Sequence, residues 1–215
     1  IHASAVIIPE MFTHTGITIE KIIRLIVSSI VKRRILKQKS GVAVVSEGIF
    51  HFLKEEDIAS SGIVFSYDTH GHPELSEVSK AHVINGILKK RLKELDLAVI
   101  CRPVEVGYSL RCVDPCAFDL TYCTTLGTGV KKLYEAGYTG CMVAVNEQDE
   151  IIPVYLKDVE DENGKIRTRL VNMNKESVRE TFRENMYFLT SQDREAAKEW
   201  ISRPEEYEYE RILGL

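Results

Sequence analysis

Short, unbroken apolar runs alternate along this chain with longer segments whose apolar residues have helical spacing. Three such runs occupy residues 4–9 (SAVIIP), 41–45 (GVAVV) and 97–101 (LAVIC). Runs of this kind are typical of strands buried on both faces, as in the parallel sheets of α/β proteins. Between the first two, residues 15–37 carry isoleucine and valine at helical spacing, with Thr18 as the candidate N-cap. A strand–helix–strand unit of this length predicts a right-handed crossover between parallel strands.

The remainder of the chain continues the alternation. Helices are expected at 74–95, 117–136, 177–186 and 192–201 (the last capped by Ser191), strands at 140–145, 151–156 and 168–172, and turns at 146–150 and 161–165. The acidic and aromatic tail, 204–209, is expected to lie on the body as a peripheral strap.

The segment 117–136 carries two further expectations. Its apolar stripe should turn inward, and its members are Leu120, Cys123, Val130 and Leu133. Gly127 and Gly129 lower helix stability relative to alanine, which suggests close approach to another backbone.

Composition argues against several functional classes. The net charge is −4, and no Lys/Arg block pairs with an aromatic platform, so nucleic-acid binding is not expected. No apolar run approaches membrane-span length, so no membrane partner is expected. Five cysteines, an odd number without a CxxC pair, favour buried free thiols in a cytoplasmic protein over disulfides or zinc. His70 and His72 resemble a metal pair, but a turn before a helix is favoured because no third ligand stands nearby.

Polar residues follow two of the predicted strands, at the points where the strands end. Glu47 follows the second run, and Arg102, Tyr108 and Arg111 follow the third. Because carboxyl ends of parallel strands meet at one edge of a sheet, these side chains are expected near one another, where α/β proteins bind ligands. Two guanidiniums in one loop indicate an anion, since arginine grips phosphate with parallel N–H donors. By position alone, a solvated loop acid explains Glu47 equally well.

The residue pattern of this loop and of the segment after it resembles that of a known protein family. GYSLR at 107–111 is followed by Pro115, then Phe118-Asp119, then a helix carrying Leu126-Gly127. This pattern resembles the phosphofructokinase family, and within it the pyrophosphate-dependent branch, over nearly the whole chain. The resemblance implies the C-terminal part of a Rossmann-like, layered α/β/α fold with a largely parallel sheet. It also implies a cytoplasmic, glycolytic homo-oligomer, a dimer or a tetramer.

The resemblance implies roles for individual residues. Glu47 matches the acid that binds fructose 6-phosphate, and Tyr108 and Arg111 match the sugar-phosphate pair of the GYxxR motif, which also contains Ser109 and Leu110. Arg102 matches an arginine that reaches the sugar phosphate of a neighbouring subunit in some relatives. Without the resemblance, a hydroxyl tether for the loop and an ion pair covering a helix would explain Tyr108 and Arg111.

The family's phosphoryl-donor loop, its general base and its Met-Gly-Arg motif are not found in this sequence. We therefore expect part of a longer protein, with residues 1–111 as a sugar-phosphate-binding α/β domain. Residues 112–215 are then a C-terminal α/β segment that packs back on the sheet and on a missing N-terminal domain. No catalytic residue or metal site is expected in this chain, and Mg²⁺ should bind mainly elsewhere, with the donor.

Three functions remain open at this point. Pyrophosphate-dependent phosphorylation of the 1-hydroxyl of fructose 6-phosphate is favoured, with this chain inactive alone. ATP in place of pyrophosphate, or a non-catalytic regulatory subunit of the same fold, are the alternatives.

Overall fold

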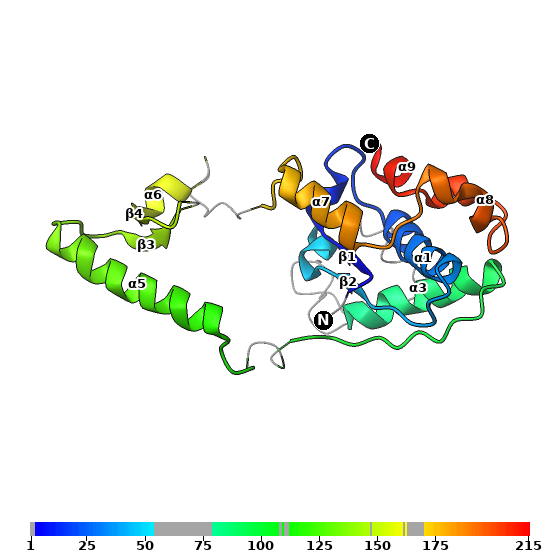
Figure 1. The fold of residues 1–215 in the computed structure, drawn as a ribbon, viewed down its shortest axis with the longest axis horizontal. Coiled ribbons are helices and arrows are strands. Elements are labelled where there is room, and N and C mark those ends of the chain that lie inside the picture. The colour runs from blue at the N-terminus through cyan, green and yellow to red at the C-terminus, as the bar shows by residue number, and fades with distance from the viewer. Residues whose placement is uncertain are drawn as a thin grey trace, which may run out of the picture. The chain divides into compact units, whose positions relative to one another are not determined.

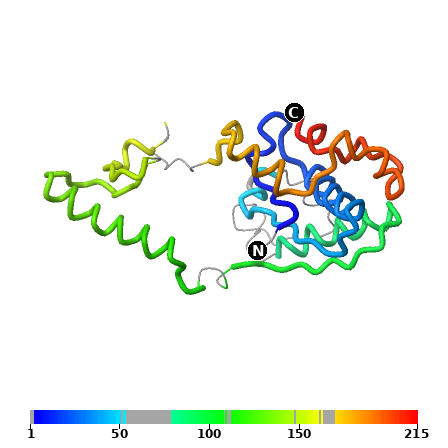
Figure 2. The backbone as a smooth tube through the Cα atoms, in the orientation of Figure 1, coloured from blue at the N-terminus to red at the C-terminus, as the bar shows by residue number. Residues whose placement is uncertain are grey.

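The computed structural model describes residues 3–53, 79–107, 109, 112–146, 148–160, 162 and 170–215. They belong to two compact units (Figure 1). The first unit comprises 1–105 together with 171–215, and the second comprises 106–170. In the first unit, the C-terminal residues lie against the N-terminal ones, as the backbone trace shows by its red and blue segments (Figure 2).

The first unit contains the predicted parallel crossover. β1 (Ala5–Ile7) is followed by α1 (Ile19–Ile35) and β2 (Ala43–Val45). The two strands pair in parallel, with Ala5 opposite Ala43. The Thr18 hydroxyl accepts a hydrogen bond from the Lys21 amide at 3.3 Å, so the predicted N-cap of α1 is confirmed. Short 3-10 helices follow both strands: η1 (Pro9–Phe12) and η2 (Glu47–Phe52).

Helix α1 is the centre of the hydrophobic core of this unit. Its most buried apolar side chains, all at 0% exposure, are Ile22, Ile23, Leu25, Val27 and Val31. The helix contacts β1 on one side, and it also contacts α3 (Lys80–Glu94), η4 (Pro204–Tyr207) and α9 (Tyr209–Leu213). α1 therefore does more than cover one face of a sheet, because helices surround it as well.

The C-terminal segment differs from expectation in detail. α7 (Glu176–Asn185) matches its prediction, but the predicted helix 192–201 is shorter and is divided into η3 (Ser191–Asp193) and α8 (Arg194–Ala197). Its cap is Thr190 rather than Ser191, since the Thr190 amide and hydroxyl each donate to Asp193 Oδ2 at 2.9 Å.

The tail beyond α8 belongs to the core rather than to the periphery. Tyr207 and Leu213 are 3% and 1% exposed. The buried Glu208 carboxylate accepts hydrogen bonds from Arg194 at 2.6 and 2.9 Å. An isolated parallel bridge joins Leu189 to Glu208, so backbone pairing as well as apolar packing holds the tail.

The second unit is a helix beside a hairpin. α5 (Ala117–Glu135) leads to β3 (Met142–Val145) and β4 (Ile151–Val154), which pair antiparallel, and then to α6 (Leu156–Val159). The turn between the strands is closed by the Asn146 side-chain oxygen, which accepts from the amides of Gln148 and Glu150, each at 2.9 Å. The predicted helix, strand, turn and returning strand are all confirmed.

Fewer side chains of α5 are buried than its apolar stripe predicted. Leu133 is buried, but Leu120 and Val130 are each 58% exposed and Cys123 is exposed as well. Gly129 is the point of close approach, to side chains of the hairpin rather than to another backbone, and nothing lies within 4 Å of a side-chain position at Gly127. The prediction that the apolar stripe of 117–136 turns inward is thus wrong for Leu120, Cys123 and Val130, and is confirmed for Leu133.

The third apolar run does not form a strand. Residues 97–106 have no strand pairing, and Ile100, Val104 and Val106 are 88%, 72% and 51% exposed. The Ala98 carbonyl accepts from the Arg34 guanidinium, at 2.5 Å, instead of from a neighbouring strand. The predicted strand 97–101 is therefore wrong in this structure.

Other predictions lie partly or wholly outside the described residues. α3 begins at Lys80 after the N-cap Ser79, and residues 74–78 and the turn 161–165, except Glu162, are not described. Of the strand expected at 168–172, the described residues 170–172 are not in a strand. The five cysteines are free, as expected, but Cys112, Cys116 and Cys123 are exposed rather than buried.

The α/β class is confirmed, with parallel pairing limited to β1 and β2 in the part of the chain described. Among the described helices, none is both long and apolar enough to cross a membrane.

Candidate functional site

The candidate site lies where β2 ends. The Ser46 amide donates to the Ile7 carbonyl at 2.9 Å, so the ladder between β1 and β2 continues to this point. Glu47 is the next residue and the first of η2, and its side chain is 72% exposed. Its position at the carboxyl end of a parallel strand is the one predicted, where α/β proteins place ligand-binding groups.

The Glu47 carboxylate forms an ion pair with Lys80. Lys80 is the first residue of α3, and its side chain is 23% exposed, far less than that of its partner. Ser79 caps the helix, since its hydroxyl accepts from the His82 amide at 3.4 Å. The Ser79 hydroxyl is also hydrogen-bonded to His82 Nδ1, at 2.7 Å. The start of α3 is thereby fixed beside the end of β2.

Glu105 also reaches the start of α3. Its Oε1 accepts from the Ala81 amide at 3.3 Å. Hydrogen bonds from the Ser79 hydroxyl, foremost, and from the Ala81 amide lower the pKa of the Glu105 carboxyl below its ordinary value. The segment after the third apolar run is therefore tied to the same place as Glu47, through the N-terminus of α3.

The other predicted residues are less well placed. Arg102 is exposed and, among the described residues, makes no hydrogen bond or ion pair. Ser109 is exposed and belongs to the second unit. Tyr108, Leu110 and Arg111 lie outside the described residues, so their roles stay predictions. The structure thus brings Glu47 together with Lys80 and places Glu105 at the same helix start.

Lys80 and Glu105 were not singled out by the sequence pattern. Lys80 carried no signal, because the helix was expected at 74–95 and this lysine then lies inside it. Glu105 carried none either, because its contact with α3 spans 24 residues of sequence.

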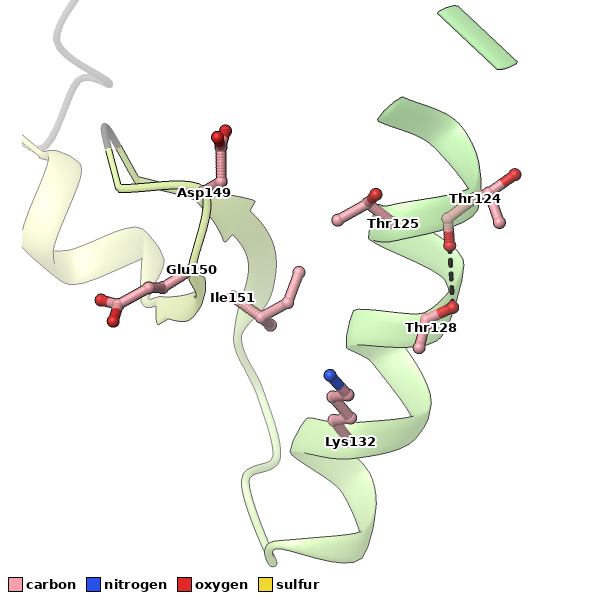
Figure 3. A pocket seen from close by; sticks show the side chains of 7 residues that line it. All are labelled: Thr124, Thr125, Thr128, Lys132, Asp149, Glu150 and Ile151. Carbon is pink, nitrogen blue, oxygen red and sulfur yellow. Dashed lines mark hydrogen bonds between the residues drawn. The ribbon is translucent and has the colours of Figure 1, made fainter. Parts of the chain in front are cut away.

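Each of the two units also has a hollow that is lined by described residues other than Glu47. In the second unit, an open hollow of about 540 Å³ lies between α5 and the hairpin, and it is lined by Thr124, Thr125, Thr128, Lys132, Asp149, Glu150 and Ile151 (Figure 3). The Thr124 and Thr128 hydroxyls donate back to helix carbonyls at 2.7 and 3.0 Å, so their protons are not available to a ligand. The hollow also holds both signs of charge, and it matches no predicted residue.

A hollow of about 650 Å³ lies in the first unit at the amino ends of β1 and β2, where Ser4, Arg33, Gly41 and Tyr187 are among its lining residues. It is therefore at the end of the strands away from Glu47. Among the described residues, no group of three or more His, Cys, Asp or Glu could hold a metal ion.

Comparison with known proteins identifies relatives. No family model matches the chain. The chain is 30% identical to pyrophosphate–fructose 6-phosphate 1-phosphotransferase of Thermotoga maritima, over 82% of this chain and 43% of that protein. It is also 30% identical to the protein of the same name from Naegleria fowleri, over 79% of this chain and 41% of that protein.

This chain is a relative of the phosphofructokinases. It spans about two-fifths of the length of these two proteins. The ATP-dependent 6-phosphofructokinase of Trypanosoma brucei brucei is 27% identical over 59% of this chain and 25% of that protein. The likeness to the pyrophosphate-dependent branch, inferred from GYSLR and the residues that follow it, is confirmed by these matches.

Proposed function

We propose that this chain is the fructose 6-phosphate-binding part of a pyrophosphate-dependent 6-phosphofructokinase. That enzyme transfers a phosphoryl group from pyrophosphate to the 1-hydroxyl of fructose 6-phosphate. The observation that carries the proposal is the 30% identity to two proteins with that activity in their names, over about four-fifths of this chain. ATP is the less favoured donor, because the relative named for ATP matches less of the chain at lower identity.

The proposed acceptor site has two parts. Glu47 supplies a carboxylate that can accept hydrogen bonds from two sugar hydroxyls. Its exposure at the end of β2 supports this role, since 72% of the side-chain surface faces solvent. Tyr108 and Arg111, with Ser109 and Leu110 in the same motif, are proposed to bind the sugar phosphate. Arg102 is proposed to reach a sugar phosphate across a subunit interface, and its exposure is compatible with that.

Phosphoryl transfer depends on positioning and on neutralising the charge of the phosphates. We propose, as the resemblance implies, that Mg²⁺ binds mainly with the donor phosphates and with parts of the protein outside this chain, and that the general base lies there as well. The role of this chain is to hold the acceptor sugar, and it should not catalyse transfer alone.

The finer architecture also belongs to the proposal. We infer that this is the C-terminal part of the enzyme, with a layered, largely parallel α/β/α arrangement in which β1 and β2 take part. Residues 1–111 are proposed as the sugar-phosphate domain and 112–215 as a segment packing back on it. The return of residues 171–215 to the first unit supports such packing. A cytoplasmic homo-oligomer, with no membrane or nucleic-acid partner, completes the proposal.

A coupled assay on the intact enzyme containing this chain tests the donor and the site. Pyrophosphate should support turnover with fructose 6-phosphate and ATP should not. Arg111→Ala should raise the KM for fructose 6-phosphate about tenfold to a hundredfold, because it removes a charge-assisted contact worth about 1.5–3 kcal/mol. Arg179→Ala, which removes an exposed arginine of α7, is the control. Turnover with ATP alone would refute the donor, and an unchanged KM in Arg111→Ala would refute the site.

A further inference from the structure

We propose that Lys80 is a positioning residue for Glu47, holding its carboxylate where it meets the hydroxyls of the acceptor sugar. The inference rests on the proposed function, because it assumes that Glu47 binds that sugar. It adds a residue from a different element, α3, to the site proposed around Glu47 at the end of β2. The two residues are 33 positions apart in sequence and form an ion pair in the fold.

The burial of the pair is uneven, and the unevenness suggests which partner serves the other. The Lys80 side chain is 23% exposed and the Glu47 side chain 72% exposed. The lysine side chain is thus largely covered by protein, while most of the glutamate side chain faces solvent. An ion pair with so exposed a partner contributes little to stability, so stability gives a weak reason for it. A glutamate side chain that is held by an ion pair and is still mostly exposed can accept hydrogen bonds from a ligand.

The place of Lys80 in α3 points the same way. It is the first residue of the helix, and the first turn of α3 contains no acid. A helix N-terminus carries partial positive charge, so a lysine there is unfavourable for the helix itself. Glu105 supplies the missing negative charge from outside the helix, by accepting from the Ala81 amide at 3.3 Å. A local rule broken in this way, and compensated by another residue, is typical of functional positions.

The function of the contact follows from the chemistry of glutamate. An exposed glutamate has several rotamers, and binding a sugar requires one of them. Fixing the rotamer beforehand removes an ordering cost that binding would otherwise include. The ammonium of Lys80 also offsets the Glu47 charge, which would otherwise repel an anionic sugar phosphate. Both effects act on binding of the sugar phosphate and not on the donor.

Steady-state kinetics of the intact enzyme tests the inference. Lys80→Met should raise the KM for fructose 6-phosphate about three- to tenfold, with kcat and the KM for pyrophosphate within about twofold of the parent. Lys80→Arg should restore most of the affinity, since it restores the cation. Lys80→Met combined with Glu47→Gln should be no worse than Glu47→Gln alone, because the lysine acts through the carboxylate. Lys90→Met, which removes an exposed lysine of the same helix, is the matched control.

The outcomes separate this inference from the proposed function. If Glu47→Gln raises the KM for fructose 6-phosphate and Lys80→Met does not, the positioning role is wrong and the sugar site stands. If Glu47→Gln leaves that KM unchanged, the assignment of the sugar site itself is wrong. A Lys80→Met variant that changes kcat and both KM values together has a general structural role, and this also overturns the inference. Lys80→Gln serves as a second substitution if the methionine variant does not fold.

Discussion

Alanine substitutions at two glycines of α5, Gly127 and Gly129, distinguish the effect of helix propensity on stability from the effect of packing. A side-chain carbon at Gly129 would lie 2.7 Å from Val143 Cγ1 and 2.8 Å from Ile151 Cδ1, whereas nothing lies within 4 Å of that position at Gly127. Alanine at either position removes the same unfavourable helix propensity of glycine. Only at Gly129 does it also meet the hairpin, so the difference between the two variants measures how closely α5 packs on β3 and β4.

The expected magnitudes follow from these distances. Gly127→Ala should stabilise the second unit by about 1 kcal/mol, the propensity difference between glycine and alanine in a helix. Gly129→Ala gains the same amount but overpacks the interface, which costs about 1–3 kcal/mol. The flexible end of Ile151 can move aside, but Val143 is branched at Cβ and cannot yield without changing its rotamer. Gly129→Ala should therefore be less stable than Gly127→Ala by about 1–3 kcal/mol.

Native-state hydrogen exchange is the suitable assay. The chain has two compact units, so a single melting or urea curve need not report on the second one. Exchange of the amides of α5, β3 and β4 gives the free energy of opening of that unit directly. Protection of these amides should rise in Gly127→Ala and should be lower in Gly129→Ala than in Gly127→Ala.

A rescue variant completes the test. Val143→Ala combined with Gly129→Ala removes the closest contact, so it should be more stable than the sum of the two single changes predicts. Equal protection in Gly127→Ala and Gly129→Ala, or additive effects in the double variant, would refute the packing of α5 on the hairpin.

Three further predictions concern titrating groups. Burial raises the pKa of Asp193, but hydrogen bonds from Lys32, at 2.7 Å, and from Thr190 outweigh it, so the net pKa is lowered. Asp193→Asn should therefore lower the free energy of unfolding near pH 7 by about 1–3 kcal/mol, as measured by urea denaturation. The difference in stability between this variant and the parent should shrink as the pH falls below about 4 and through the lowered pKa of Asp193 in the folded protein. Burial raises the pKa of Cys101, so iodoacetamide followed by mass spectrometry should label it more slowly than exposed Cys112. Burial raises the pKa of Tyr209 to about 12, so the contribution of this neutral side chain to stability should be fully present below about pH 10 and lost towards pH 12. Absorbance titration of the tyrosine together with circular dichroism would show this.

Local pattern was sufficient wherever an element forms from neighbouring residues. The β1–α1–β2 crossover, the Thr18 cap and the sequence of α5, β3, turn and β4 were all predictable, because periodicity, capping residues and turn signals act within a few positions. The likeness to phosphofructokinases could also be recognised from the sequence, in GYSLR and the residues after it. These features need no knowledge of which distant segments meet.

Tertiary structure decided the features that depend on partners far away in sequence. An unbroken apolar run such as 97–101 has no period that points to a partner, and a strand exists only when another strand pairs with it. In the fold, Arg34 bonds to the Ala98 carbonyl instead, and the run stays unpaired. The apolar stripe of α5 likewise showed which residues could be buried. Contact with the hairpin, which covers only part of the helix, determines that Leu133 is buried and that Leu120 is exposed. The pairing of Glu47 with Lys80 is of the same kind, since an ion pair across 33 residues is set by how α3 lies against the end of β2, not by the sequence around either residue.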